Sequence, residues 1–132
     1  MIASCSEEDG IELLHIFNQA ITNKEFIKYL RYLKRKNRQR IALFCDQLSV
    51  HRSKEVKVVY EELDIRPIYN VGYSPEYNPI ESVFSQVKRT YNRERLNKLA
   101  NGEIFDQTDQ IRRSFKKITK QVIAACVKKS MN

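Results

Sequence analysis

The sequence predicts an α/β fold, and three segments in the first half of the chain carry that prediction. Ile41–Cys45 is a continuous apolar run, which is typical of a strand buried on both faces. Residues 53–63 place apolar side chains at helical spacing, and residues 65–69 form a second short apolar run. A strand, a helix and a strand within such a short stretch predict a parallel βαβ unit.

The N-terminal segment predicts a β-hairpin. Ile2–Ser6 and residues 11–17 are short apolar runs, and they flank the stretch Glu8-Asp9-Gly10. A turn that ends in glycine between two such runs is a hairpin signal.

Three further segments predict amphipathic helices. The first begins at a capping box, Thr22-Asn-Lys-Glu25, and carries apolar residues at spacings of four and three. The second runs from Pro79 to about residue 96. The third starts near Thr108, after the helix-breaking pair Asn101-Gly102.

The composition favours a single domain with an acidic partner. A chain of 132 residues with 42% hydrophobic residues suits one domain with a core. The formal net charge of +8 favours nucleic acid as the partner, and a solvated basic surface is the alternative. The sequence contains neither a long apolar run nor a signal-peptide pattern, so we expect no membrane partner and no secretion. Three widely spaced cysteines without a CxxC favour a reducing compartment.

Two acidic residues stand where α/β sheets bind ligands. Asp46 follows the first buried strand, and Glu81 lies in the first turn of the helix after the next strand. Hard oxygen ligands of this kind suit Mg²⁺ or Mn²⁺. A structural role is open for both: Asp46 can start a turn, and Glu81 can complete a capping box with Asn78 and Pro79.

The stretches around these acids resemble a known family. "LFCDQLSVHRSKEV" is similar to the strand that bears the second aspartate of mariner-type transposases, and "YSPEYNPIESVFSQVKR" is similar to their third-acid motif. The spacing between Asp46 and Glu81, with 34 residues between them, also matches. The resemblance is to the DDE-superfamily endonuclease domain of the mariner superfamily, from about residue 2 to residue 95. It departs at Gln47, where the family usually has asparagine. It implies a ribonuclease H-like mixed sheet flanked by helices.

The resemblance also implies an activity and a site. Such enzymes cut the ends of a DNA transposon and join them to target DNA, using two Mg²⁺ or Mn²⁺ ions in the complete enzyme. Asp46 and Glu81 would then be catalytic metal ligands. His51 would shape the site or touch DNA, unless it is a structural histidine. The loop that aims Glu81 would consist of Tyr73, Ser74, Pro75, Asn78 and Pro79. The residues expected to contact DNA are Arg35, Lys36, Arg38, Arg52, Lys88 and Arg89.

Finally, the resemblance implies a truncated domain. The family's first catalytic aspartate lies on a central strand upstream of the hairpin, so residues 1–100 would form a partial catalytic domain. Residues 101–132 would form a C-terminal basic helix packed on it or extending it. We therefore expect the isolated chain to be inactive. The complete enzyme could be a homodimer, acting in the nucleus of a eukaryote or otherwise in the cytoplasm or nucleoid.

A second function stays open on the sequence alone. A decayed or repurposed remnant would bind nucleic acid without catalysis, through the basic helices at residues 24–40 and 108–129.

Overall fold

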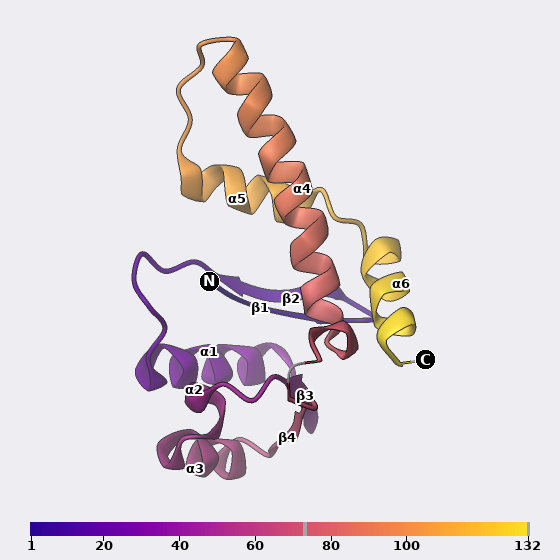
Figure 1. Ribbon diagram of the computed structural model, residues 1–132. Helices are drawn as coiled ribbons and strands as arrows, with labels where there is room; N and C mark the ends of the chain where they lie inside the picture. Colours follow the sequence, from indigo (N-terminus) through magenta and orange to yellow (C-terminus); the bar gives the residue numbers. More distant parts are fainter. Residues whose placement is uncertain (73, 132) are drawn as a thin grey trace. The chain divides into compact units, whose positions relative to one another are not determined.

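A computed structural model describes residues 1–72 and 74–131 of the chain and shows a mixed α/β protein (Figure 1). Its elements are, in order, β1 (Ile2–Ser6), β2 (Gly10–His15), α1 (Asn23–Lys36), β3 (Ile41–Cys45), α2 (Ser49–Arg52), α3 (Lys54–Glu62), β4 (Ile65–Tyr69), a short 3₁₀ helix η1 (Pro75–Tyr77), α4 (Pro79–Ala100), α5 (Gln107–Lys116) and α6 (Lys120–Met131). The α/β class predicted from the sequence is confirmed.

The chain divides into two compact units. The first contains residues 1–4 and 12–78, and the second contains residues 5–11 and 79–132. The β1–β2 hairpin therefore contributes residues to both units. The predicted hairpin is confirmed, with its turn at residues 7–9.

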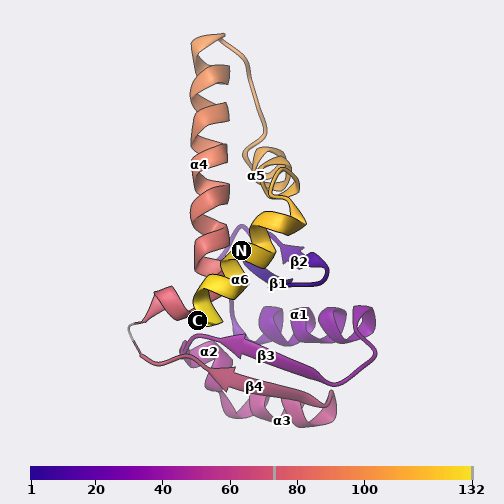
Figure 2. The same ribbon diagram turned by 90° about the vertical axis from the view of Figure 1, so that its right-hand side faces the viewer.

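The first unit contains the predicted βαβ arrangement. β3 and β4 pair in parallel, with Ile41 opposite Ile65 and Cys45 opposite Tyr69 (Figure 2). The crossover between them is α3, which begins after the N-cap Ser53, whose Oγ accepts a hydrogen bond from the Val56 N–H. Parallel pairing brings the carboxyl ends of both strands to the same edge of the sheet.

The expectation that the first strand of this unit is buried on both faces is wrong. Residues 41 and 43 of β3, with Ile65 of β4, pack on a core formed mainly by α1 and α3. Side chains alternate between the two faces of a strand, and on the other face Ala42 and Arg66 are exposed. The apolar run signalled a strand correctly, but burial depends on which elements cover each face, and that is not a local property.

The start of α1 follows from its sequence. The Glu25 carboxylate accepts a hydrogen bond from the Thr22 N–H at 2.8 Å, as the capping box predicts. The apolar residues at helical spacing, Phe26, Leu30 and Leu33, are buried. This helix supplies half of the buried core of the first unit.

The second unit is built around α4, which begins at Pro79 as predicted and extends four residues past the predicted end. Its termination at Asn101-Gly102 is also confirmed. Gly102 has φ +67°, and the Glu103 N–H donates to the Lys98 carbonyl at 2.9 Å. This 6→1 bond, with the Gly102 N–H bonded to Leu99, is a Schellman ending that uses a left-handed glycine.

The prediction of one continuous tail helix is wrong, because the structure contains two. α5 ends at Lys116, and α6 starts at Lys120. The Thr119 hydroxyl accepts a hydrogen bond from the Val122 N–H at 3.3 Å. A threonine that caps the next helix interrupts the ladder of the previous one. Within residues 1–72 and 74–131, no helix is both long and apolar enough to cross a membrane.

Candidate active site

Asp46 lies at the carboxyl end of β3, directly after its last residue. The Asn70 N–H, which follows the last residue of β4, donates to the Cys45 carbonyl at 2.8 Å. The ladder between the strands thus continues to the point where Asp46 leaves the sheet. Asp46 and Asn70 are held at one edge of the first unit, where α/β proteins commonly bind ligands.

The Asp46 carboxylate is held through one of its two oxygens. Oδ1 lies 2.7 Å from Nδ1 of His51 and accepts the Leu48 N–H at 3.2 Å. Within the described part of the chain, Oδ2 has no hydrogen-bond partner. The side chain is 43% exposed. One oxygen is therefore fixed and the other faces no competing donor, which is a suitable state for a metal ligand.

His51 is fixed by its surroundings as well as by Asp46. Nδ1 also lies 3.2 Å from the Asp46 carbonyl oxygen. Both neighbours of Nδ1 are oxygens, so Nδ1 acts as the hydrogen-bond donor in these contacts. The ring packs 4.6 Å from the ring of Phe26 in α1, and its side chain is 17% exposed. A packed ring with one committed nitrogen is well suited to orient Asp46.

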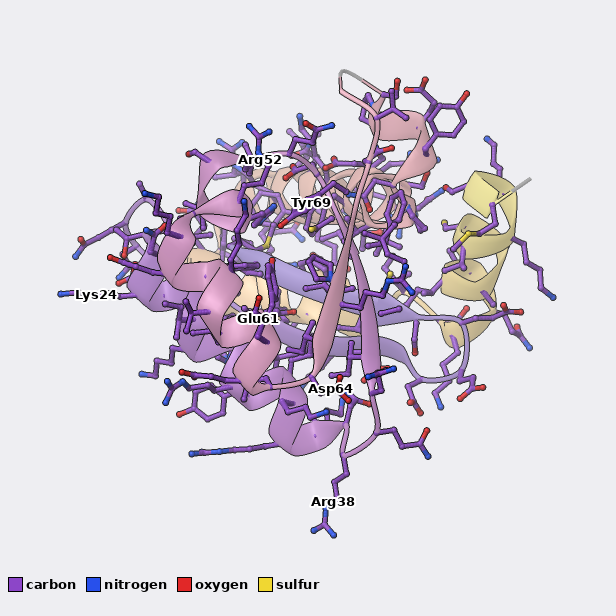
Figure 3. All side chains as sticks on the ribbon, turned by 90° about the horizontal axis from the view of Figure 1, so that it is seen from below. Lys24, Arg38, Arg52, Glu61, Asp64 and Tyr69 are labelled. Atoms are coloured by element: carbon purple, nitrogen blue, oxygen red, sulfur yellow. The ribbon has the colours of Figure 1, made fainter. Side chains whose placement is uncertain are left out.

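A second layer of polar contacts supports this edge. The Tyr69 hydroxyl donates to the His51 carbonyl at 3.0 Å, and the Gln47 amide donates to the Asn70 carbonyl at 2.7 Å. Arg52 donates to Gln47 at 3.3 Å and lies close to Tyr69 (Figure 3). Partial burial, with a smaller effect of Cys45, raises the pKa of Tyr69. The contacts tie α2 to the ends of both strands.

Tyr69 and Asn70 were not predicted from the sequence as supporting residues. The available signal was their position: a tyrosine and an asparagine close the second strand as Cys45 and Asp46 close the first. Gln47 stood out only as a departure from the family. Its amide bridges two segments that are 23 residues apart.

The loop before Glu81 is ordered by short-range hydrogen bonds. The Asn70 side chain donates to the Ser74 carbonyl at 2.5 Å, and the Asn78 N–H donates to the Pro75 carbonyl at 2.9 Å. Asn78 is only 6% exposed. Tyr73, which was expected in this loop, lies outside the described residues. The remaining predicted loop residues form one continuous, hydrogen-bonded approach to α4.

Glu81 is the third residue of α4 and is partly buried. The first residue of the helix is Pro79, a position where proline needs no N–H partner. Asn78 has an extended backbone, with φ −100° and ψ 107°, as an N-cap residue requires. Asp46 belongs to the first unit and Glu81 to the second.

The residues expected to contact DNA lie in three places. Arg35 and Arg38 line a pocket of about 610 Å³ at the end of α1, together with Arg31 and Lys34. Arg38 lies at the opposite end of the β3–β4 sheet from Arg52 (Figure 3). Lys36, the last residue of α1, is paired with Glu12 at 4.0 Å. The third place is α4 of the second unit, which carries Lys88 and Arg89.

The donor chemistry of the two acids suits a hard divalent cation, because both offer carboxylate oxygens. Among the residues that the structure describes, no group of three or more His, Cys, Asp or Glu side chains gathers as a metal centre does. Asp46, with its unused oxygen, and Glu81, at a helix start, are thus the candidate ligands that this chain offers.

Comparison with models of protein families gives a match to the first three quarters of the chain. A family model described as DDE superfamily endonuclease matches residues 1–101, which include Asp46, His51 and Glu81 but neither α5 nor α6. No curated protein and no solved structure matches the chain.

Proposed function

Because the chain belongs to the DDE superfamily endonucleases, we propose that it is part of a mariner-type transposase that cuts and joins DNA. The observation that carries the proposal is the Asp46 carboxylate, held at the carboxyl end of β3 by His51 at 2.7 Å. It lies in the family-matched segment and leaves one oxygen available. The Asn-Pro-Ile-Glu81 helix start in the same segment supports it.

Asp46 and Glu81 are the proposed ligands of Mg²⁺ or Mn²⁺. Bound divalent ions in such sites activate a water and stabilise the leaving oxygen of a phosphodiester. His51 orients Asp46 through Nδ1, and Tyr69 and Gln47 keep α2 against the strand ends. The cap geometry at Asn78 and Pro79 fixes the backbone on which Glu81 stands.

The proposal includes a third acid and a further strand from outside these 132 residues. In the described residues, β1–β2 and β3–β4 form two separate two-stranded sheets. β3 therefore pairs with a strand along one edge alone, and its other edge carries backbone groups that a further strand could pair. A ribonuclease H-like sheet places the strand with the first aspartate there.

Mn²⁺ binding tests the two ligands directly. Titration followed by electron paramagnetic resonance should show weakened binding in Asp46→Asn and in Glu81→Gln. Glu76→Gln is the matched control, because Glu76 is an exposed glutamate on η1, five residues before Glu81. Unchanged Mn²⁺ affinity in both Asp46→Asn and Glu81→Gln would exclude the proposed ligands.

Cleavage assays test the expected incompleteness. The 132-residue chain should not cut transposon ends with Mg²⁺, because two carboxylates do not readily hold two ions. Metal-dependent cleavage that Asp46→Ala abolishes would show that no further acid is required. Binding of DNA that is indifferent to metal and to Glu81→Gln, without Mn²⁺ affinity, would favour the non-catalytic remnant.

A further inference from the structure

The second unit contains a basic pocket that lies largely outside the segment matched by the family. Its volume is about 480 Å³, and it is formed between the end of α4 and α5. α4 and α5 lie side by side in both ribbon views (Figures 1 and 2). The lining carries four cations, Lys98, Arg113, Lys116 and Lys117, and a single carboxylate, Glu94.

The single carboxylate is already committed within the protein. Glu94 accepts hydrogen bonds from the Gln110 amide and from the Lys117 ammonium. Gln110 is only 2% exposed, and its hydrogen bond to Glu94 is partly buried between the two helices. The hydrogen bond from Lys117 is the main reason that the pKa of Glu94 is lowered. Glu94 therefore fixes the walls of the pocket and neutralises little of its remaining charge.

The other cations of the lining differ in how far they are already paired. Arg113 pairs with Asp109 at 2.8 Å on the same helix, and Lys98 lies 5.7 Å from the centre of the Phe105 ring. Lys116 is exposed and has no ion-pair partner among the described residues. The Asn97 amide adds a polar group to the lining. Such a set suits the oxygens of phosphate groups.

The charge of the tail extends well beyond one small anion. Residues 107–132 contain seven lysines and arginines and a single acidic residue, Asp109. A basic surface of this extent is the electrostatic footprint expected for a polyanion, and each contacted phosphate releases counterions from DNA.

We propose that the basic pocket between α4 and α5 binds phosphates of the DNA backbone, as a contact additional to the candidate active site. The inference rests on the proposed function only in taking DNA as the partner. It assigns to the C-terminal helices a positioning role that is independent of sequence and of metal.

The test measures binding of the 132-residue chain to a fluorescein-labelled DNA duplex in EDTA, over a series of salt concentrations. The double variant Lys98→Gln/Lys116→Gln should bind several-fold more weakly. The slope of log affinity against log salt should become shallower by about 1.8, if two phosphate contacts are lost at about 0.9 each. Lys54→Gln/Lys57→Gln removes the same charge from two exposed positions on α3, and should keep the wild-type slope. Thermal melts establish that all variants are folded.

Three outcomes would overturn the inference: equal slope changes in the two double variants, no slope change in either, or no DNA binding by the wild type. A further arm replaces chloride with inorganic phosphate at constant ionic strength. The wild type should still bind DNA. If phosphate displaced DNA from the wild type but not from the Lys98→Gln/Lys116→Gln variant, the basic pocket would instead be assigned to free phosphate. The DNA-binding assays contain EDTA, whereas the metal ligands are tested by Mn²⁺ titration. The proposal for the basic pocket and the proposal for the metal ligands are thus tested in separate assays, so the failure of one can be told from the failure of the other.

Discussion

His51 and Asp46 contact each other twice, through the side chain and through the backbone. Nδ1 of His51 lies 2.7 Å from the Asp46 carboxylate and 3.2 Å from the Asp46 carbonyl. The two residues are five positions apart along the chain, and the ring of Phe26 packs against the imidazole. A packed ring therefore contacts the carboxylate, and the role that we propose for His51 is to position Asp46.

Removing His51 should weaken metal binding without abolishing it. We expect His51→Ala to reduce Mn²⁺ affinity by about 10–100-fold, the usual effect of losing a group that orients a ligand. His51→Asn should restore part of the affinity, because its amide can donate a hydrogen bond near the position of Nδ1. Lys54→Gln, at an exposed position three residues further on, is the control. Equal losses in the asparagine and alanine variants would indicate that His51 does not act by holding Asp46.

The hydroxyl of Tyr60 should be dispensable for stability. Tyr60 is 2% exposed, and its hydroxyl has no hydrogen-bond partner by geometry among the described residues. Tyr60→Phe should leave the free energy of unfolding unchanged or raise it by up to about 1 kcal/mol, because an unsatisfied buried group is removed. Tyr29→Phe is the comparison: its hydroxyl donates to Ser4 at 2.7 Å or Leu13 at 3.1 Å, and its loss should cost about 1–2 kcal/mol. Urea unfolding measures both, and a larger loss for Tyr60→Phe would contradict the prediction.

Alkaline pH should lower the stability of the wild type more than that of Tyr60→Phe. Burial, and then the neighbouring Cys45 and Tyr69, raise the pKa of Tyr60 above its ordinary value of 10. The folded state keeps this proton longer than the unfolded state, so the stability it contributes is present below pH 10 and is lost as pH rises beyond it. Wild-type stability should fall more steeply than that of Tyr60→Phe above pH 10. Parallel pH profiles would show that Tyr60 does not control the loss.

Neutralising Glu94 should loosen α5 from α4. Glu94→Gln replaces an acceptor of two hydrogen bonds and should lower the melting temperature, whereas Glu103→Gln, at an exposed residue, should not. Because the pKa of Glu94 is lowered, its contribution is present above its ordinary value of 4.5 and is lost as pH falls below it. The difference between wild type and Glu94→Gln should therefore shrink from pH 7 to pH 3. If the difference in melting temperature between the wild type and Glu94→Gln did not change with pH, an ionic role of Glu94 would be excluded.

The three glycines should respond differently to alanine. Gly10 has φ +76°, and an added Cβ would lie 3.1 Å from Cγ of Lys120. Gly102 has φ +67° but no atom within 4 Å, so Gly102→Ala should cost about 1–2 kcal/mol from backbone strain alone. Gly10→Ala should cost at least as much. Gly72, with open space and no positive φ, is the neutral control for the unfolding measurements.

The sequence predicted those features that depend on a few neighbouring residues. The Thr22 capping box, the start of α4 at Pro79 and its end at Gly102 are local, and all three are confirmed. The break at Thr119 was not predicted, because Phe115, Ile118 and Val122 continue a helical apolar spacing across it. The periodicity was genuine, but a side-chain cap interrupted it.

At the candidate site, the sequence identified the two acids and His51, but it did not identify Tyr69 and Asn70. Asp46 was found because it follows an apolar run. The hydrogen bonds from Gln47 to Asn70 and from Tyr69 to His51 depend on how β3 and β4 are paired, which composition does not reveal. The assignment of Asp46 and Glu81 as metal ligands stays a prediction until metal binding is measured.

The second unit joins the beginning of the chain to its end, since residues 5–11 belong with residues 79–132. At Gly10 the hairpin turn packs on Lys120 and Ile123 of α6. During synthesis, residues 12–78 leave the ribosome before α4 exists, and α6 follows last. The βαβ unit can therefore begin to fold on the nascent chain, whereas the hairpin turn waits for α6. Synthesis of α6 is thus the event that allows the second unit to close.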